Sequence, residues 1–446
     1  MNVGFIHLGC SKNLVDTEMA IGLFKNNNYN VVNNPEEADI IVINTCGFIE
    51  SAKEEAINTI LEMAEYKKKR CRYLIAMGCL VERYKEELAK AIPEVDLWIK
   101  YSSYNTIWEQ IEKVIKPEKT LKREMDFLDR TITTGSNYAY LRIAEGCSNF
   151  CTYCAIPKIR GKYVSRKMEN ILEEASMLAN EGYQEIIVIA QDTGRYGIDI
   201  YNKPMISELL RKLCKIEKIK WLRFLYTYPE TIDDELIKTI KEEDKICKYL
   251  DIPIQHISDT VLKRMNRKSS SESIKELIKK LREEIPNVVI RTTVMVGFPG
   301  ETKEDFEQLY DFIKTAKFDR LGAFSYSKEE NTPAARLQEQ IHPSTKRSRY
   351  NKIMKLQKEI ANENQKALMG KELEVLIETK TFDNKYYVGR SYREVPEIDS
   401  LIYIKADESQ LEGKFVKCKI IGVQDYDLIG KMWRCPRGLE DIGDIL

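Results

Sequence analysis

Short apolar runs alternate with amphipathic stretches through the first 130 residues of the chain. The apolar runs, rich in β-branched residues, cover 3–8, 39–44 and 72–77, and helix-period patterns cover 16–26, 51–66 and 81–91. Strands that alternate with helices are typical of βαβ units. We therefore predict a first domain, residues 1–132, in which helices cover a parallel sheet.

A second α/β series begins after the polar segment TTGSN at 133–137. Six strand patterns follow, namely YAYLRIAEG, EIIVIA, KWLRFLY, KYLDIPI, NVVIRTTVMVG and RLGAFSY, with helix patterns such as 168–181, 271–284 and 303–316 between them. Six strands at this spacing predict a partial or complete β/α barrel of the TIM type. With a long polar helix pattern at 343–368, they make up a predicted central domain, residues 133–368.

The pattern changes again after Gly370. Short alternating strands, ELEVLIET, YYVGRS, SLIYIKA and KFVKCKIIGV, are separated by turn residues, which predicts a small all-β barrel at 369–436. A tail, 437–446, follows. The predicted fold class is α/β, with a parallel α/β domain, a β/α barrel and a terminal β-barrel.

Composition narrows the class of protein. The 446 residues are 43% apolar and 31% charged, the balance of a folded protein. The 70 Lys and Arg residues equal the 70 Asp and Glu residues, so no overall basic field indicates nucleic acid. We find no signal-peptide pattern and no apolar stretch near the roughly 20 residues that span a bilayer. We therefore expect a cytoplasmic protein with no membrane partner.

Eleven cysteines in a reducing compartment favour metal or thiol chemistry over disulfides. The sharpest pattern is Cys147, Cys151 and Cys154 in EGCSNFCTYCAIP, just after the first predicted barrel strand. Three thiolates on one loop can hold three irons of a 4Fe–4S cubane and leave the fourth iron open for the amino and carboxylate groups of S-adenosylmethionine. Structural zinc is the alternative, but it takes four ligands and no fourth Cys or His follows nearby.

A second triad of cysteines lies in the first domain. Cys10, Cys46 and Cys79 each follow the carboxyl end of one predicted parallel strand. Because these strand ends share one edge of an open sheet, the three thiols should converge there, beside Gly9 and Gly78. We predict a second cluster with an open iron at this edge. The alternative is that the three cysteines are ordinary buried residues.

The CxxxCxxC spacing resembles the radical S-adenosylmethionine superfamily, and other segments share the resemblance. It implies that Tyr153 and the GFPGET segment, with Gly297 and Gly300, lie near the adenine. The same resemblance implies that AQDT contacts the methionine amino group through Gln191, Asp192 and Thr193. It also implies that Arg291 binds the methionine carboxylate, although a surface ion pair would explain this arginine equally well.

Taken together, the two cysteine triads and the terminal barrel resemble the methylthiotransferase family of radical S-adenosylmethionine enzymes. The resemblance covers nearly the whole chain and implies two 4Fe–4S clusters and a substrate-holding TRAM domain. The segments LGCSKNLVDTE, DIPIQHISDTVLKRM and YVGRSYREVPEID resemble the branch that methylthiolates the β-carbon of an aspartate in ribosomal protein uS12. The branch that modifies adenosine in tRNA instead resembles GCQMN where this chain has GCSKN, and PxQSGS where this chain has PIQHIS.

Charge supports the protein substrate over tRNA. Between residues 368 and 435 there are 11 Lys or Arg and 12 Asp or Glu, whereas a barrel that grips tRNA should be basic. A near-neutral barrel suits the basic protein uS12, unless its acids simply solvate an exposed loop. The acids expected to face this partner are Glu394, Glu397, Asp399, Glu440, Asp441 and Asp444.

Some assignments stay open at the level of the sequence. An electron donor such as flavodoxin or ferredoxin is implied. A tRNA adenosine methylthiotransferase and a non-catalytic iron–sulfur sensor on the ribosome are the alternative functions. His256 is either a capped structural histidine or a residue at the barrel mouth. No role is assigned to Cys71, Cys214, Cys247, Cys418 and Cys435.

Overall fold

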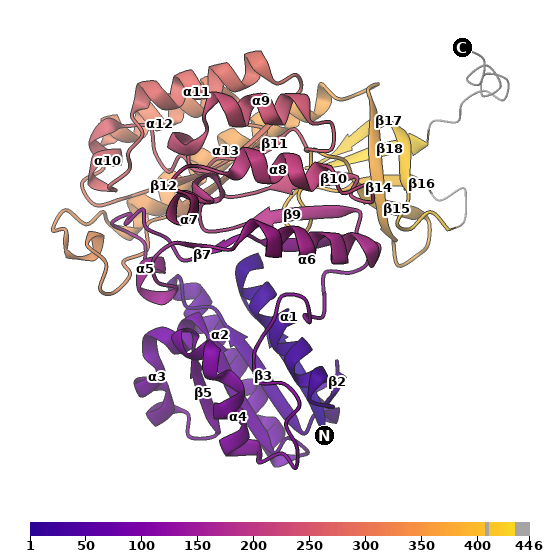
Figure 1. The fold of residues 1–446 in the computed structure, drawn as a ribbon. Helices are drawn as coiled ribbons and strands as arrows, with labels where there is room; N and C mark the ends of the chain where they lie inside the picture. Colours follow the sequence, from indigo (N-terminus) through magenta and orange to yellow (C-terminus); the bar gives the residue numbers. More distant parts are fainter. Residues whose placement is uncertain (406–409, 433–446) are drawn as a thin grey trace, which may run out of the picture.

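The computed structural model describes residues 1–405 and 410–432. Figure 1 shows three parts: an N-terminal domain, a larger central domain above it, and a small barrel at one end of the central domain. Within these described residues, no helix combines the length and the apolar character needed to traverse a bilayer.

The N-terminal domain is a five-stranded sheet of order β2-β1-β3-β4-β5, and every neighbouring pair is parallel. The chain places β2 on one side of β1 and then places β3, β4 and β5 in turn on the other side. The order of the strands therefore reverses between β1 and β3. The elements are β1 (Asn2–His7), α1 (Ser11–Asn26), β2 (Asn30–Val32), β3 (Ile40–Thr45), α2 (Glu50–Ala64), β4 (Tyr73–Gly78), α3 (Cys79–Ala91), β5 (Leu97–Lys100) and α4 (Ile107–Ile115).

Helices cover both faces of this sheet, which explains why its central strands are apolar throughout. Ile41 and Ile43 of β3 pack with α2 and α3 on one face, and Ile40 and Val42 pack with α1 and α4 on the other. The two cores together fix the register of β1, β3 and β4. Their carboxyl ends therefore lie side by side at one edge.

The central domain contains six parallel strands in chain order, divided into the sheets β10-β9-β6 and β11-β12-β13. A parallel bridge between Leu222 and Ile246 joins the two sheets. Its strands are β6 (Tyr138–Arg142), β7 (Ala144–Glu145), β8 (Val164–Ser165), β9 (Glu185–Ile189), β10 (Trp221–Phe224), β11 (Tyr249–Asp251), β12 (Val289–Val296) and β13 (Arg320–Ser325). Its helices are α5 (Ile156–Ile159), α6 (Met168–Asn180), α7 (Ile198–Tyr201), α8 (Ile206–Cys214), α9 (Asp234–Glu242), α10 (Asp259–Arg264), α11 (Ser271–Glu284), α12 (Lys303–Ala316) and α13 (Pro343–Lys366).

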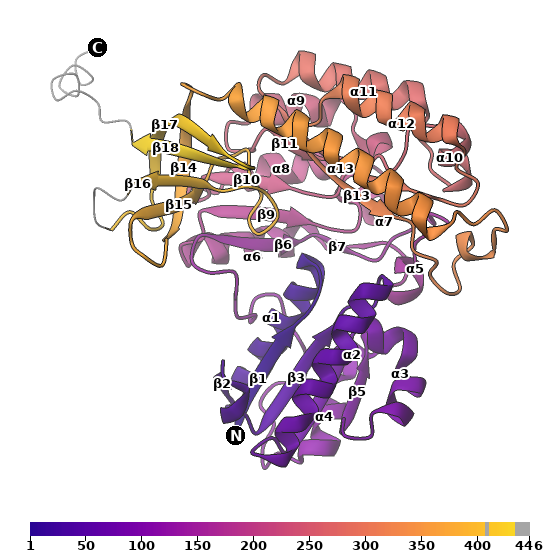
Figure 2. The same cartoon turned by 180° about the vertical axis from the view of Figure 1, so that it is seen from behind.

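These strands form a partial barrel, since the described residues show no pairing between β6 and β13. The long helices lie outside the strands, and Figure 2 shows α13 crossing the back of the domain toward the small barrel. The predicted α/β fold class with a β/α barrel is confirmed, with six strands instead of the eight of a complete TIM barrel.

The small barrel is closed in the order β14-β15-β16-β18-β17. Its strands are β14 (Glu372–Lys380), β15 (Tyr386–Arg390), β16 (Ile402–Lys405), β17 (Phe415–Gln424) and β18 (Asp427–Met432). Alternate side chains such as Val375, Ile377 and Cys418 fill its interior. The remaining short elements of the chain are 3₁₀ turns: η1 (Pro35–Glu37), η2 (Glu65–Lys68), η3 (Tyr101–Thr106), η4 (Thr193–Arg195), η5 (Pro229–Thr231) and η6 (Ala334–Arg336).

The inner face of the partial barrel is covered by the other two parts of the molecule. Val15 and Met19 of α1 pack there against Tyr140 and Ile187, and Val395 from the small barrel joins the same cluster. In Figures 1 and 2 one end of α1 meets the central domain beside β6 and β7. The N-terminal cysteine edge therefore lies against the central domain.

Candidate active site

The three N-terminal cysteines follow three neighbouring strands. Cys10 follows β1, Cys46 follows β3, and Cys79 begins α3 directly after β4. Their loops approach closely, because a Cβ on Gly9 would lie 3.2 Å from the Cys46 Sγ. Burial, with contributions from Cys10 and Cys46, raises the pKa of the Cys79 thiol to about 12, against the opposing charge of Arg160. The three thiols thus share one local environment.

The second triad lies on the loop that follows β6 and β7. The Cys147 amide donates to the Gly161 carbonyl at 3.1 Å, and the Cys154 amide donates to the Cys151 carbonyl at 3.0 Å. Burial raises the pKa of Cys154 to about 12, and the sulfurs of Cys151 and Cys147 contribute to the rise. This loop therefore gathers three thiols that would be stabilised as thiolates by a bound cation.

The two triads meet at the short helix α5. Cys79 packs against Ala155 and Ile159, which lie one and five residues after Cys154. The Arg160 Nη2 lies 3.6 Å from the Cys79 Sγ and ion-pairs with Asp16 at 2.9 Å. A single turn of helix and one guanidinium consequently separate the two cysteine sites.

The donor set fits iron–sulfur clusters. In the described part of the chain, no group of three or more His, Cys, Asp or Glu side chains is placed to hold a metal ion. A cubane differs from a metal ion because each thiolate binds a different iron, so its ligands stand around the whole cluster. Soft thiolate donors, three to each site, suit such a cluster.

Tyr153 and the GFPGET segment lie together. The rings of Tyr153 and Phe298 meet edge to face, with centroids 6.4 Å apart. Gly297 has φ +71° and its amide donates to Glu301, as does the Phe298 amide at 3.0 Å. Burial raises the pKa of Glu301 to about 7, against the Arg349 charge. The end of β12 is thus held beside the CxxxCxxC loop.

The AQDT segment adjoins the same loop. Asp192 is fully buried, and its Oδ2 accepts a 2.8 Å hydrogen bond from Asn149, two residues after Cys147. Its Oδ1 has no partner among the described residues, and burial raises the pKa of this carboxyl to about 6. Thr193 Oγ1 lies 3.0 Å from Thr227 Oγ1. Asp192 therefore presents an acceptor that no protein group satisfies; Gln191, its neighbour, is partly exposed.

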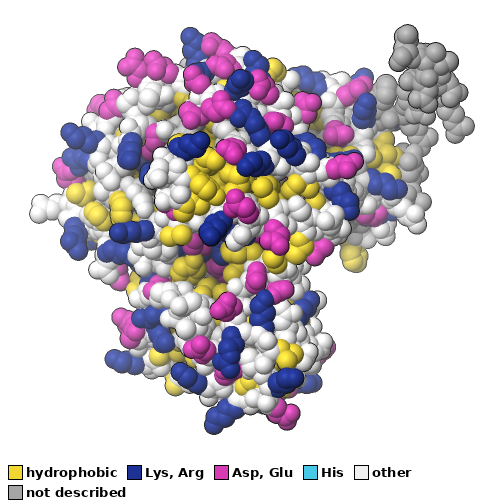
Figure 3. Space-filling model, in the orientation of Figure 1, with side chains coloured by type: hydrophobic (Ala, Val, Ile, Leu, Met, Phe, Trp, Pro, Cys, Tyr) yellow, Lys and Arg dark blue, Asp and Glu magenta, His cyan; other side chains and the backbone are white. Residues whose placement is uncertain are grey.

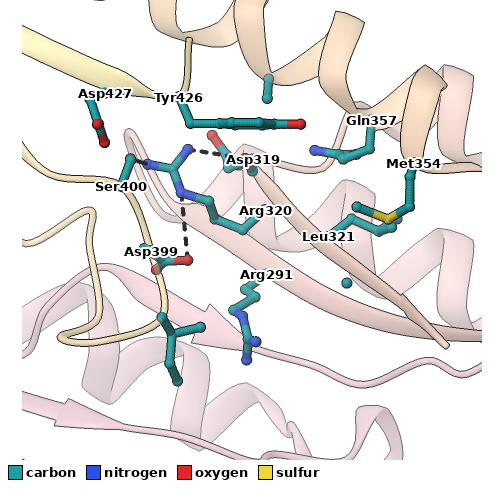
Figure 4. Close-up of a pocket in the computed structure, with 13 residues that line it drawn as sticks. Arg291, Asp319, Arg320, Leu321, Met354, Gln357, Asp399, Ser400, Tyr426 and Asp427 are labelled. Atoms are coloured by element: carbon teal, nitrogen blue, oxygen red, sulfur yellow. Dashed lines mark hydrogen bonds and ion pairs between the residues drawn. The ribbon is translucent and has the colours of Figure 1, made fainter. Parts of the chain in front are cut away.

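Arg291 lies elsewhere. It ion-pairs with Asp251 at 3.1 Å and lines a cavity of about 420 Å³ that also contacts the small barrel (Figure 4). It precedes Gly297 by six residues, about 20 Å along an extended strand. No contact among the described residues joins it to the CxxxCxxC loop. A closer cation is Arg195, whose Nη1 donates to Asn149 at 3.0 Å.

Two of the acids expected on the partner surface are buried, so that expectation is wrong for them. Glu394 accepts from Ser391 and ion-pairs with Arg320, and Asp399 accepts from the Tyr249 hydroxyl at 2.7 Å. Figure 4 shows Arg320 reaching Asp399 and Ser400. Glu397 is exposed. The acids Glu440, Asp441 and Asp444 lie outside the described residues, as does Cys435.

Sequence reasoning missed the charged residues that join the two domains. Asp16 ion-pairs with Arg142 at 2.5 Å as well as with Arg160, and Glu145 pairs with both arginines at 2.9 and 3.1 Å. Glu329, after β13, pairs across the same boundary with Lys53 and Arg83. Spacing along the chain gives no signal for contacts between residues this far apart.

His256 is a buried structural residue. It is fully inaccessible, its Nδ1 accepts from the Ser258 amide at 3.0 Å, and burial lowers its pKa to about 4. Cys214, Cys247 and Cys418 are buried among apolar side chains. Cys71 is buried in the N-terminal core. None of these residues approaches either cysteine triad.

Comparison with known proteins agrees with this architecture. Residues 141–313 match the radical SAM superfamily, residues 2–100 the "Uncharacterized protein family UPF0004", and residues 369–432 the TRAM domain. The structure resembles TsrM, a radical S-adenosylmethionine methyltransferase from Kitasatospora setae solved with cobalamin and a [4Fe-4S] cluster. That likeness has a TM-score of 0.57 at 12% identity and covers 75% of this chain and 76% of TsrM. At that identity it supports the fold alone.

Closer relatives cover nearly the whole chain. "Ribosomal protein uS12 methylthiotransferase RimO" of Alkaliphilus oremlandii is 59% identical over 97% of this chain and 99% of its own. The protein of the same name from Acetivibrio thermocellus is 50% identical, over 96% and 98%.

The domains and cysteine sites define a radical S-adenosylmethionine methylthiotransferase with a terminal TRAM domain. Within that class, the chain belongs to the RimO family. Membership confirms the resemblance found in the sequence and the enzyme class, whose cofactors are S-adenosylmethionine and 4Fe–4S clusters.

A substitution at Gly78 tests whether the edge of the N-terminal sheet holds an iron–sulfur cluster. It has φ +103°, and a Cβ there would collide with Asn44 Oδ1 and lie 2.6 Å from the Thr45 carbonyl oxygen. We expect Gly78→Ala to displace the Cys46 and Cys79 loops and to lower the iron content of anaerobically reconstituted protein by about half. Gly322→Ala is the matched control, since a Cβ there meets nothing within 4 Å. Full iron content in the Gly78 variant would contradict the assignment.

A substitution at His256 tests whether this side chain is buried in its neutral form in the central domain. Because its folded pKa of about 4 lies below the unfolded value of 6.5, its contribution to stability is present above pH 6.5 and lost as the pH falls toward 4. Between pH 7.5 and 5.5 the unfolding free energy should drop by about 1 kcal/mol more in the parent protein than in His256→Asn. Urea unfolding at both pH values measures this. Equal pH dependence in the two proteins would show that His256 is not held neutral.

Proposed function

We propose that this chain attaches a methylthio group to the β-carbon of an aspartate in ribosomal protein uS12. The observation that carries the proposal is the meeting of two cysteine triads at α5, with Cys79 packed on Ala155 and Ile159. The names of the relatives at 50 and 59% identity support the uS12 substrate. A ribosomal substrate places the enzyme in the cytoplasm, and flavodoxin or ferredoxin would supply its electrons.

In this proposal each triad holds one 4Fe–4S cluster. Cys147, Cys151 and Cys154 hold the cluster that binds S-adenosylmethionine, and Cys10, Cys46 and Cys79 hold the auxiliary cluster. When bound, the two clusters and S-adenosylmethionine supply the carbon-centred radical that removes a hydrogen atom and the sulfur that replaces it.

The protein groups around the first triad position the cosubstrate. Tyr153 and Phe298 offer an aromatic wall for the adenine, and we assign the backbone at Gly297 and Gly300, which both have positive φ, to the same side of the site. Asp192 offers its unpartnered Oδ1 to the methionine amino group, beside Gln191 and Thr193. Arg195, whose Nη1 donates to Asn149 on the CxxxCxxC loop, is a second candidate beside Arg291 for the group that would bind the carboxylate.

Cys79, Cys147 and Cys151 are buried, and this burial would help to keep water away from a reactive carbon radical. Aspartate β-hydrogens are too weakly acidic for removal by a positioned histidine or carboxylate, so acid–base groups do not suffice. The surface agrees with a protein substrate. Figure 3 shows Lys and Arg side chains interspersed with Asp and Glu on the face it displays, without the basic tract that tRNA binding favours.

Mass analysis of cells that lack this chain tests the substrate. We expect uS12 to lose the mass of one methylthio group and regain it when the gene is restored, with tRNA nucleosides unchanged. Loss of a methylthio-adenosine with normal uS12 would instead identify a tRNA enzyme. Unchanged uS12 and tRNA would favour the non-catalytic sensor.

Two cysteine variants separate the roles of the triads. Cys151→Ala should abolish formation of 5′-deoxyadenosine, because the cosubstrate-binding cluster loses a ligand. Cys46→Ala should still form 5′-deoxyadenosine but transfer no methylthio group to uS12. Cys418→Ala, in the interior of the small barrel, is the control for loss of a thiol alone. A methylthiolated product from the Cys46 variant would refute the auxiliary role.

A further inference from the structure

One buried lysine lies between the two cysteine sites. Lys12 is in the first turn of α1, two residues after Cys10, and only 4% of its surface is exposed. Its side chain leaves the N-terminal domain and places Nζ 3.3 Å from the centre of the Tyr226 ring, at the end of β10. The ammonium therefore sits on the inner face of the central domain.

The charge of Lys12 is not compensated by a carboxylate. The buried arginines nearby, in contrast, each have carboxylate partners. Arg142 and Arg160 both pair with Asp16 and Glu145, and Arg291 pairs with Asp251. Among the described residues Lys12 forms no ion pair, and its Nζ lies over the face of the Tyr226 ring. Burying an ammonium group without a paired anion costs several kcal/mol of folding free energy. A fold that nevertheless buries Lys12 in this way indicates that a bound ligand supplies the anion.

Two carboxylates near Lys12, Asp251 and Asp16, are already paired with arginines. Asp251 feels the Lys12 charge, but its oxygens accept from Arg291 and from the Tyr226 amide at 3.2 Å. Asp16 is occupied by its two arginines. Asp251 and Asp16 are therefore each paired with arginine, and neither forms an ion pair with Lys12.

The position of Lys12 suits the reacting part of a substrate. On one side it adjoins Cys10, whose thiol feels its charge. On the other, the Tyr226 carbonyl accepts a 3.0 Å hydrogen bond from the amide of Thr193, next to Asp192. A group held over Tyr226 would therefore lie between the auxiliary triad and the segment that adjoins the CxxxCxxC loop.

We propose that Lys12 binds the side-chain carboxylate of the substrate aspartate and so determines specificity for an acidic residue. The inference rests on the proposed function. Holding the carboxylate fixes the adjacent β-carbon, which is the reacting atom, between the two cysteine sites. Asparagine has the same shape but no charge, so it would leave the buried ammonium unpaired and be rejected. Lys12 orients the substrate and exchanges no proton or electron with it.

Affinity measured without turnover tests this role. The probe is a fluorescent uS12 peptide that contains the target aspartate, and its partner carries asparagine there. Anisotropy titrations use unreduced enzyme with both clusters and S-adenosylmethionine bound. We expect the parent protein to bind the aspartate peptide at least about tenfold more tightly than the asparagine peptide.

Three variants make the test specific. Lys12→Met keeps the length and apolar stem and should bind the two peptides equally. Lys12→Arg should recover part of the preference. Lys25→Met, an exposed position on the same helix, should behave as the parent protein. Iron content and cluster absorbance report whether each variant is assembled.

The outcomes separate this inference from the proposed function. An unchanged aspartate preference in assembled Lys12→Met would overturn it. If that variant instead lost affinity for S-adenosylmethionine and kept the preference, the partner of Lys12 would be the methionine carboxylate, and the inference would be wrong. Failure of the parent protein to bind or modify uS12 would overturn the proposed function, and this inference with it.

Discussion

A buried ionic network holds the two cysteine sites against each other. Asp16 of α1 accepts from Arg142 and Arg160 of the central domain, and these side chains are nearly inaccessible. Removing one partner of such a group leaves a charge stranded in low dielectric and typically costs about 3–5 kcal/mol. Two domains joined by an apolar contact of equal area could shift relative to each other, whereas paired guanidinium and carboxylate groups fix one relative orientation of the domains. The relative position of the domains, and hence of the two triads, depends on this network.

The same network affects the chemistry of the thiols. Burial raises the pKa of Cys79, and the Arg160 guanidinium opposes that rise. A fixed cation beside the sulfur lowers the free energy of the thiolate form, which is the form that binds metal. Arg160 thus both docks the N-terminal domain through Asp16 and stabilises negative charge at the edge where the three thiols meet. One residue links assembly of the domains to assembly of the site.

The sequence was informative where local pattern decides structure. The apolar runs before Cys10, Cys46 and Cys79 predicted β1, β3 and β4, and strand ends in a parallel sheet must share an edge. The short strands β2 and β5, of three and four residues, were missed because so few positions carry little pattern. The six strands of the central domain were long or apolar enough to be recognised in order.

Charged side chains could not be assigned in this way. Arg291, Glu394 and Asp399 all lie on or beside predicted strands, yet their partners come from elements far away in the chain: Asp251 for the arginine, Arg320 and Tyr249 for the acids. Pairing of this kind is decided by tertiary packing, and nothing in periodicity or spacing reports it. In the structure Tyr153, Phe298 and Asp192 lie beside the CxxxCxxC loop, whereas Arg291 pairs with Asp251 on the neighbouring strand, and its role as a carboxylate ligand stays a prediction.

Inward pairing of these acids changes how the small barrel can recognise a partner. Arg390 of β15 pairs with Glu185 at 2.8 Å, and Arg393 pairs with Asp319 at 3.1 Å, so the segment after β15 is committed to the central domain. Because these groups are desolvated and satisfied, they have no charge to offer a basic protein. Two acids, Glu394 and Asp399, and two arginines, Arg390 and Arg393, are thus turned inward together, so a count along the chain overstates the charge of both signs on the barrel surface. The side chains that this domain turns outward include Phe382 and Tyr386, so a partner that docked on this face would meet contact area and shape more than net charge.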